Sequence, residues 1–526
     1  MIFWPWWSAD SITYTDAGYL LTHGYFTDAA RGPAYPLFLE FAQRLTRVRA
    51  FHIMHAYTAA ELPYLLGRAF DEPAAQAATV LQSILGLLTA GLLYSTLRTL
   101  RIRKWLAFAA ALLFAVLHVT CQFEMLILTQ SVALFAVMLS IWLYTRAMAN
   151  IADGRNPACV SVLAGIAFSA AILVRSEIVI FFAVVVLMTA LLWIRFHLSP
   201  GLKRQARLLR TLAVLMPVAA SPLLLAWMSW NYVGIGRFQL TTLTGWSMSE
   251  PVYNLFDRVS PEDRILGELL TTSYLIRNHP EQAPGRRFWL ATPRGEVIQD
   301  HYWATFADII ARRFEMPLPE PNTAPDSKFI TWLLSLGRPD ARLYTHNFLS
   351  GSRIRTVWER DPNDIGDYVG KVSWELALKY PGDWLRNAAD NFARESFRFN
   401  FGPPGTNPTP DPVSLGGHAS VVRNRNLREF AVFWNRTQVP ILTIAYIFAL
   451  GLALFSPFVL LRARRPDALH DATAAILAVA LLAQIAAFSL LACYMPKYAV
   501  VNLATIFICA VYVLENAKRA ITALRS

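Results

Sequence analysis

The sequence predicts an all-α polytopic membrane protein, and three observations carry that prediction. Hydrophobic residues make up 55% of the 526 residues and charged residues only 16%, whereas soluble proteins carry about 25% charged residues. Apolar runs close to the length of a membrane span, roughly 20 residues, recur along the chain. The runs are continuously apolar and do not alternate, which favours helices over the strands of a barrel.

Nine runs are predicted to be membrane helices, near residues 78–97, 106–120, 125–147, 159–174, 177–197, 211–230, 438–462, 470–493 and 498–515. Four basic clusters follow or separate these runs: Arg98, Arg101, Arg103 and Lys104; Lys203, Arg204, Arg207 and Arg210; Arg462, Arg464 and Arg465; Lys518, Arg519 and Arg525. Cytoplasmic loops are enriched in Lys and Arg, so these clusters predict the cytoplasmic ends of the helices. The clusters account for much of the net charge of +12, and nucleic-acid binding is not indicated.

This topology divides the chain into four regions. Residues 1–77 form a first external loop with short interfacial helices, and residues 78–230 form a transmembrane bundle. Residues 231–435 form a mixed external insertion on the periplasmic side, in which Trp374–Phe399 is predicted to be a helix pair broken at Pro381. Residues 436–526 supply the last membrane helices and a cytoplasmic tail. Met1–Trp7 is too short to span, so we expect a preceding span to be missing from this start.

Acidic residues near the predicted outer face are the first candidates for chemistry. Asp10 and Tyr14 are four residues apart and share a face if the segment is helical. A carboxylate there can act as a general base toward an acceptor hydroxyl or amine, and the alternative is a simple N-cap. Glu124 lies in the short connection between the second and third runs, where it can position the acceptor or bind a divalent metal such as Mg²⁺ or Mn²⁺. The alternative is a solvated loop charge.

Basic residues near the same face are candidates for binding a phosphate. Arg175 interrupts an apolar run at its predicted external end, where a guanidinium can hold a phosphate through two hydrogen bonds. Lys497 and Tyr498 lie at the external mouth between the last two runs. Interfacial anchoring is the alternative for both Arg175 and Lys497.

No nucleotide-binding P-loop, dinucleotide-binding glycine motif or HExxH zinc motif is found in the sequence. A donor must therefore arrive already activated, which suits a lipid-phosphate substrate. Two functions other than the transfer of a single activated group remain open. One is a polysaccharide ligase or polymerase, which would move a preassembled glycan, and the other is a membrane transporter. A transporter usually shows paired halves, and no internal repeat is visible here.

Several segments together resemble the GT-C superfamily of polytopic glycosyltransferases, in its protein mannosyltransferase-like and lipid A aminoarabinose transferase-like branch. The matching segments are Asp10–Tyr14, Arg31–Phe38, Leu126–Phe135, Gly165–Arg175, Tyr380–Leu385 and Pro496–Tyr498. Two positions depart from the family pattern: Gln130 stands where a Glu is frequent, and Lys497 stands where an Arg commonly precedes the Tyr.

The resemblance implies a GT-C-like helix bundle that moves a sugar from a polyprenyl-phosphate carrier to a lipid, glycan or protein acceptor. It implies that Asp10 is the catalytic base and that Glu124 assists or binds a metal. It also implies that Arg31, Arg175 and Lys497 hold the donor phosphate. The location expected from this resemblance is the cell inner membrane, with the catalytic loop on the periplasmic side.

Overall fold

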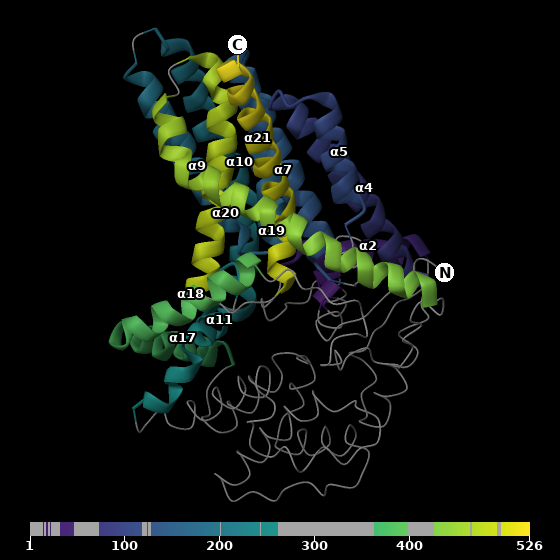
Figure 1. Cartoon of the computed structure of the whole chain (residues 1–526). Coiled ribbons are helices and arrows are strands. Elements are labelled where there is room, and N and C mark those ends of the chain that lie inside the picture. The colour runs from purple at the N-terminus through teal and green to yellow at the C-terminus, as the bar shows by residue number, and fades with distance from the viewer. Residues whose placement is uncertain are drawn as a thin grey trace, which may run out of the picture.

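The computed structural model describes residues 14, 17–18, 21–22, 32–46, 73–117, 124, 128–199, 201–241, 244–260, 362–397, 425–462, 465–491 and 496–525. Within these ranges every regular element is a helix (Figure 1): α2 (Ala34–Thr46), α4 (Pro73–Thr99), α5 (Lys104–Ala115), α7 (Gln130–Ala152), α8 (Ala158–Val174), α9 (Ile178–His197), α10 (Lys203–Ile235), α11 (Thr244–Ser249), η2 (Glu250–Arg258), α17 (Pro362–Lys379), α18 (Pro381–Phe397), α19 (Arg425–Arg462), η5 (Pro466–Ala468), α20 (Leu469–Leu491) and α21 (Pro496–Arg525).

The prediction of an all-α polytopic membrane protein is confirmed. Within the described ranges, seven helical segments are long and apolar enough to cross a membrane, and they lie in α4, α7, α9, α10, α19, α20 and α21. The other two predicted spans correspond to α5 and α8, which have 12 and 17 residues. At 1.5 Å per residue these helices are roughly 18 and 25 Å long, shorter than the hydrocarbon layer of about 30 Å. Within the described residues, seven of the nine predicted spans are therefore long enough to cross a membrane, and α5 and α8 are shorter.

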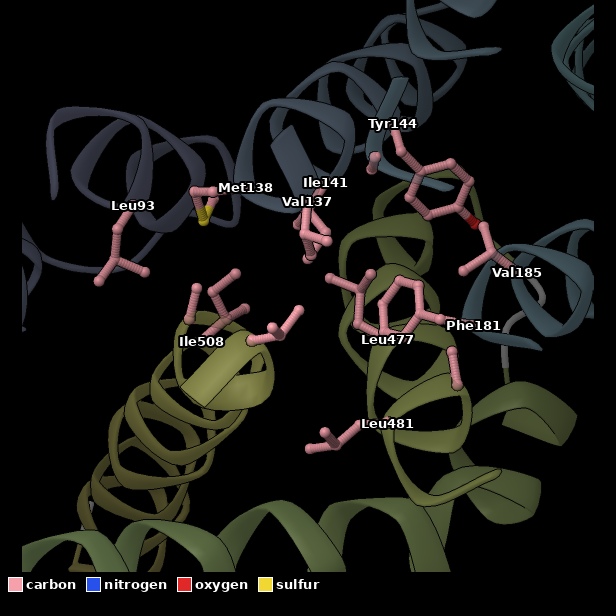
Figure 2. Packing of buried hydrophobic residues seen from close by; sticks show 14 of the residues in the cluster. Leu93, Val137, Met138, Ile141, Tyr144, Phe181, Val185, Leu477, Leu481 and Ile508 are labelled. Carbon is pink, nitrogen blue, oxygen red and sulfur yellow. The ribbon is translucent and has the colours of Figure 1, made fainter. Parts of the chain in front are cut away.

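The core of the bundle lies around α7, whose buried side chains face α20 and α21 (Figure 2). Val137 and Ile141 lie toward Leu477 of α20 and Ile508 of α21 in this view. The buried Tyr144 hydroxyl shares a hydrogen bond of 2.9 Å with Thr189 Oγ1 of α9. Lipid tails are as apolar as these side chains, so close packing and hydrogen bonds between helices hold the bundle together.

Small residues let the helices approach closely. A Cβ atom on Gly165 of α8 would overlap the main-chain oxygen of Met216 in α10, so only glycine fits at this crossing. Helix α20 presents five fully buried alanines to its neighbours, namely Ala472, Ala474, Ala475, Ala478 and Ala480. This use of small residues is typical of helix interfaces in membranes.

The basic clusters meet at one end of the bundle, where the C-terminus also lies (Figure 1). Arg101 pairs with Asp467 at 3.1 Å, and Arg204 donates to the main-chain oxygen of Gly154 at 2.8 Å. Arg103 Nε lies 2.9 and 3.0 Å from the two carboxylate oxygens of Glu515. These contacts join segments that are far apart in the sequence.

Arg101 has an unusual backbone conformation, with φ of 63°. It follows the end of α4, where the Ile102 N–H donates to Leu97 O at 3.0 Å. A left-handed residue commonly closes a helix in this way, and that residue is usually glycine. An L-residue with a side chain costs about 1–2 kcal/mol in this conformation.

We expect Arg103→Ala to lower the free energy of unfolding by about 2 kcal/mol, because it takes the ion-pair partner from a buried carboxylate. Glu515 is only 2% exposed. Arg155→Ala is the matched control, since Arg155 lies 4.0 Å from Asp153 and both side chains are exposed; its expected cost is below about 0.5 kcal/mol. Thermal unfolding in detergent measures both, and equal shifts would contradict the expectation.

At the opposite end, α11, η2, α17 and α18 form a small cap against the end of α20. The Trp384 indole of α18 donates to Leu490 O at 3.0 Å, and Arg258 of η2 pairs with Asp383 at 3.1 Å. The predicted helix pair is confirmed, because α17 ends at Lys379 and α18 begins at Pro381. Proline suits this first position, where its missing N–H has no helical partner anyway.

Helix α2 lies against α4 near this end of the bundle. Its residues Tyr35, Leu39 and Ala42 are buried, whereas Leu37, Phe41 and Leu45 form an exposed apolar stripe. A short helix with one packed face and one exposed apolar face suits the interface of a bilayer, as the sequence predicts.

Candidate functional site

Glu124 lies in the connection between α5 and α7, with its side chain in a small pocket between four helices. The pocket is lined by Gly86 and Thr89 of α4, Phe114 and Ala115 of α5, Ser131 and Leu134 of α7, and Val500 of α21. The first turn of α7 lies at this pocket, and its last turn lies at the end of the bundle where the basic clusters meet. The two ends are therefore separated by the length of α7, roughly 34 Å for its 23 residues.

A chain of contacts links the first loop to Glu124. The Tyr14 and Tyr35 rings meet edge to face, with centroids 5.0 Å apart. The buried Tyr35 hydroxyl donates to Gln82 Oε1 at 2.9 Å. Gln82 Nε2 donates in turn to the main-chain oxygen of Glu124 at 2.8 Å. The position of the Glu124 backbone is thus tied to α2 and α4.

The surroundings of Glu124 change its acidity. Burial raises the pKa of the Glu124 carboxyl to about 7, although a hydrogen bond with Ser83 acts in the opposite direction. Burial also raises the pKa of Tyr35 well above its usual value, and the neighbouring Tyr14 adds to this effect. Near neutral pH, Tyr35 is therefore a neutral donor and Glu124 is poised between its two protonation states, as suits an acid–base group.

We expect the stability of the folded protein to depend on the protonation state of the Glu124 carboxyl. The unfolded chain has an ordinary Glu pKa of 4.5, below the value of about 7 in the folded protein. The folded state therefore binds the proton more tightly, and its stability falls as pH rises from about 4.5 to 7. Relative to Glu124→Gln, the wild type should lose up to about 3 kcal/mol over this range. Melting temperatures of both proteins from pH 4.5 to 8.5 measure the difference, and parallel curves would contradict it.

The pocket is small. Its volume is about 10 Å³, which is the order needed for one water molecule. A hydroxyl group of a substrate fits there, but a sugar ring does not. The buried Gln130 Oε1 and Ser131 Oγ have no hydrogen-bond partner among the described residues. Gln130 Oε1 therefore makes no hydrogen bond across helices within the described residues.

The described neighbours of Glu124 do not make a divalent-cation site. No group of three or more His, Cys, Asp or Glu side chains lies together within the described ranges. The pocket adds the hydroxyls of Thr89 and Ser131 to one carboxylate, whereas Mg²⁺ and Mn²⁺ favour several carboxylate or carbonyl oxygens. The binding of a divalent metal by Glu124 stays a prediction.

Arg175 closes the C-terminal end of α8 and is 7% exposed. Its guanidinium forms an ion pair with Glu177. The first loop comes close to this helix end, because a Cβ atom on Gly32 would overlap the main-chain oxygen of Leu173. Glycine is thus required where the Arg31–Pro36 motif meets α8. Arg175 does not line the Glu124 pocket, and its role toward a donor phosphate stays a prediction.

The other predicted site residues are only partly described. Asp10 and Arg31 lie outside the described residues. Lys497 and Tyr498 belong to the first turn of α21, and their side chains lie outside the described residues. Val500, which lines the Glu124 pocket, follows Lys497 by three residues. The backbone therefore places both positions within about one helical turn of the pocket.

Sequence reasoning missed Tyr35, Gln82 and Gly86 as members of the site. Tyr35 belongs to the Arg31–Pro36 motif, and Gln82 is a polar residue inside an apolar run. Polar side chains in membrane helices are costly unless they have partners. That signal singles out Gln82, although only the structure shows its partners.

Residues 22–242 match the family model of dolichyl-phosphate-mannose-protein mannosyltransferases, which is less than half of the chain. This region of the chain is therefore similar to membrane glycosyltransferases of the GT-C superfamily. This match agrees with the predicted resemblance to glycosyltransferases, and the seven apolar helices within the described residues confirm the prediction of a multi-pass membrane protein. The matched region contains Tyr35, Gln82, Glu124 and Arg175, but not Asp10 or Lys497.

Two solved structures are similar to this chain, both of an oligosaccharyltransferase from Archaeoglobus fulgidus. One is AglB with an inhibitory peptide and a dolichol-phosphate, with 11% identity and a TM-score of 0.35. The other is the apo form, with 12% identity and a TM-score of 0.32. Each similarity covers 99% of this chain and 48% of the archaeal chain, so the chain spans about half the length of those proteins. A comparison with curated proteins found no match.

Proposed function

We propose that this protein transfers a sugar from a polyprenyl-phosphate-linked donor to a lipid, glycan or protein acceptor on the outer face of a membrane. One observation carries the proposal: the family match falls on the region that holds Glu124 in its small pocket. When deprotonated, the Glu124 carboxylate, whose pKa is about 7, can accept a hydrogen bond from an acceptor hydroxyl or amine and so position it.

The acidic residues have separate roles in this proposal. Asp10 is the catalytic base that takes the acceptor proton. Glu124 positions the acceptor, and Tyr14 supports it from the first loop. The contacts from Tyr14 through Tyr35 and Gln82 to Glu124 support this division, because they connect the start of the chain with the pocket.

The basic residues Arg31, Arg175 and Lys497, with Tyr498, bind the donor phosphate in this proposal. Two backbone features support it. Gly32, next to Arg31, lies against the end of α8 that carries Arg175. The first turn of α21, which contains Lys497 and Tyr498, begins beside the pocket. Cationic side chains here would neutralise the charge that develops on the leaving phosphate.

The proposed reaction mainly requires that the donor and the acceptor are held in the correct relative position. The acceptor oxygen or nitrogen forms a bond to the anomeric carbon while the bond from that carbon to the phosphate oxygen breaks. The acceptor proton goes to Asp10, and the polyprenyl phosphate leaves with the bonding electrons. A single displacement of this kind inverts the anomeric centre, so a product with retained configuration would overturn it.

The orientation is also part of the proposal. The basic clusters meet at one end of the bundle and the Glu124 pocket lies at the other. With the basic end in the cytoplasm, as the distribution of Lys and Arg favours, Glu124 and the cap formed by α11, η2, α17 and α18 lie on the outer side. In a bacterial host this corresponds to the inner membrane and the periplasm.

Membranes containing the wild type or Asp10→Asn, supplied with a panel of radiolabelled polyprenyl-phosphate sugars, test the proposal. We expect transfer from at least one donor, and its loss in Asp10→Asn protein that inserts normally. Transfer of a preassembled glycan in place of a single sugar would favour a ligase. No transfer from any donor, with substrate movement across the membrane instead, would favour a transporter.

A further inference from the structure

A second pocket lies at the basic end of the bundle, across the length of α7 from Glu124. Its volume is about 500 Å³, and it is lined by Leu100, Arg101, Arg462, Arg465, Asp467, Ala468, His470 and Asp471. The lining residues come from the end of α4, the end of α19, η5 and the start of α20. Nothing in the proposed sugar transfer uses this pocket.

The acidic and the basic side chains that line the pocket differ in how far they are paired. Asp467 is paired with Arg101 at 3.1 Å, and Asp471 accepts a hydrogen bond from the Tyr512 hydroxyl. In contrast, no described residue pairs with the guanidinium groups of Arg462 and Arg465. Both aspartates are thus engaged, while donors remain available at the mouth of the pocket.

His470 adds a donor at the base. It is 7% exposed, and its Nε2 atom has no hydrogen-bond partner among the described residues. A buried polar atom without a partner is costly and calls for an explanation. Nε2 can donate a hydrogen bond in one neutral tautomer and in the charged form of the ring. An acceptor atom of a bound molecule would supply the missing partner.

The backbone conformation of Arg101 also supports a bound molecule in this pocket. Its left-handed conformation, with φ of 63°, would suit glycine better, and residues held in such conformations cluster at ligand-binding sites. The exposed ion pair with Asp467 contributes little by itself. A guanidinium that is needed in the pocket explains why an arginine occupies this strained position.

We propose that this pocket binds a phosphate group, held by Arg101, Arg462 and Arg465 and completed by His470. Guanidinium groups match phosphate oxygens with paired, charge-assisted hydrogen bonds. The phosphate belongs either to the headgroup of an anionic phospholipid or to a free phosphate ion. The site is separate from the proposed sugar-transfer site and does not depend on it.

The test uses the purified full chain in a non-ionic detergent. Inorganic phosphate, dihexanoyl phosphatidic acid and dihexanoyl phosphatidylcholine are titrated separately, and binding is measured as Kd. Arg101→Gly removes the guanidinium and relieves the backbone strain, so the melting temperature should stay the same or rise. We expect it to weaken phosphate binding at least tenfold, and the double variant Arg462→Gln, Arg465→Gln to do the same.

Arg155→Gln is the control, because Arg155 is exposed at the same end and lies outside the pocket; its Kd should match the wild type. A preference of tenfold or more for phosphatidic acid over inorganic phosphate assigns the site to a lipid headgroup, and similar affinities assign it to a phosphate ion. The proposal is overturned if the wild type binds neither probe. Unchanged Kd values in both pocket variants would overturn it as well.

Discussion

Glu124→Gln is expected to reduce sugar transfer by about 100-fold, with the protein still folded and inserted. The substitution keeps the shape of the side chain and its contact with Gly86, but it removes the ionisable group. The loss cannot come from instability, because a neutral side chain suits this pocket at least as well as a carboxylate. Burial is what raises the pKa of Glu124 to about 7, so the amide avoids a desolvation cost at pH 8.

The activity of the wild type should also depend on pH through this group. If the deprotonated form holds the acceptor, transfer rises between about pH 6 and 8 and levels off above. The residual transfer of Glu124→Gln should lack that rise. Glu375→Gln is the control, since Glu375 is 61% exposed and, among the described residues, pairs with Lys371. Equal rates for the wild type and Glu124→Gln would remove Glu124 from the site.

Gly86→Ala should cut transfer by about 100-fold by displacing the Glu124 carboxylate. A methyl group at this position would overlap Glu124 Oε1, so the carboxylate must shift. A displacement of about 1 Å at a site can cost about 100-fold in rate. Alanine is a better helix former than glycine by about 1 kcal/mol, so the helix itself should not suffer.

Gly91→Ala is the matched control on the same helix. Nothing lies within 4 Å of a Cβ atom at Gly91, so this variant should keep full transfer and gain slightly in stability. The comparison separates displacement of the carboxylate from any general effect of a methyl group on α4. Full transfer by Gly86→Ala would mean that the position of Glu124 does not matter.

The helices could be predicted from local pattern because each signal is contained in a short stretch. Pro381 marks the break between α17 and α18, and the apolar runs mark the spans. Helix α5 shows the limit of this reasoning, since its run continues past the point where the helix ends at Ala115. Hydrophobicity alone does not say where a helix stops, and no cap side chain signals this end.

The site was less predictable because its contacts join distant parts of the chain. Glu124 stands out as an acid among apolar residues, yet its raised pKa depends on how α4 and its other neighbours bury it. The hydrogen bond from Tyr35 to Gln82 spans 47 residues, and no pattern in one sequence reports such a pairing. The roles of Asp10 and Arg31 rest on the resemblance, since both lie outside the described residues.

The burial of α7 has a consequence for how the protein is made. Helix α7 packs against α4 and α8, and also against α20 and α21, the last helices of the chain, as Met138 and Ile508 illustrate (Figure 2). During translation, α7 is completed more than 300 residues before α20 and α21. Assembly of the core is therefore completed only at the end of translation, and a chain truncated before residue 466 would remain an open set of helices.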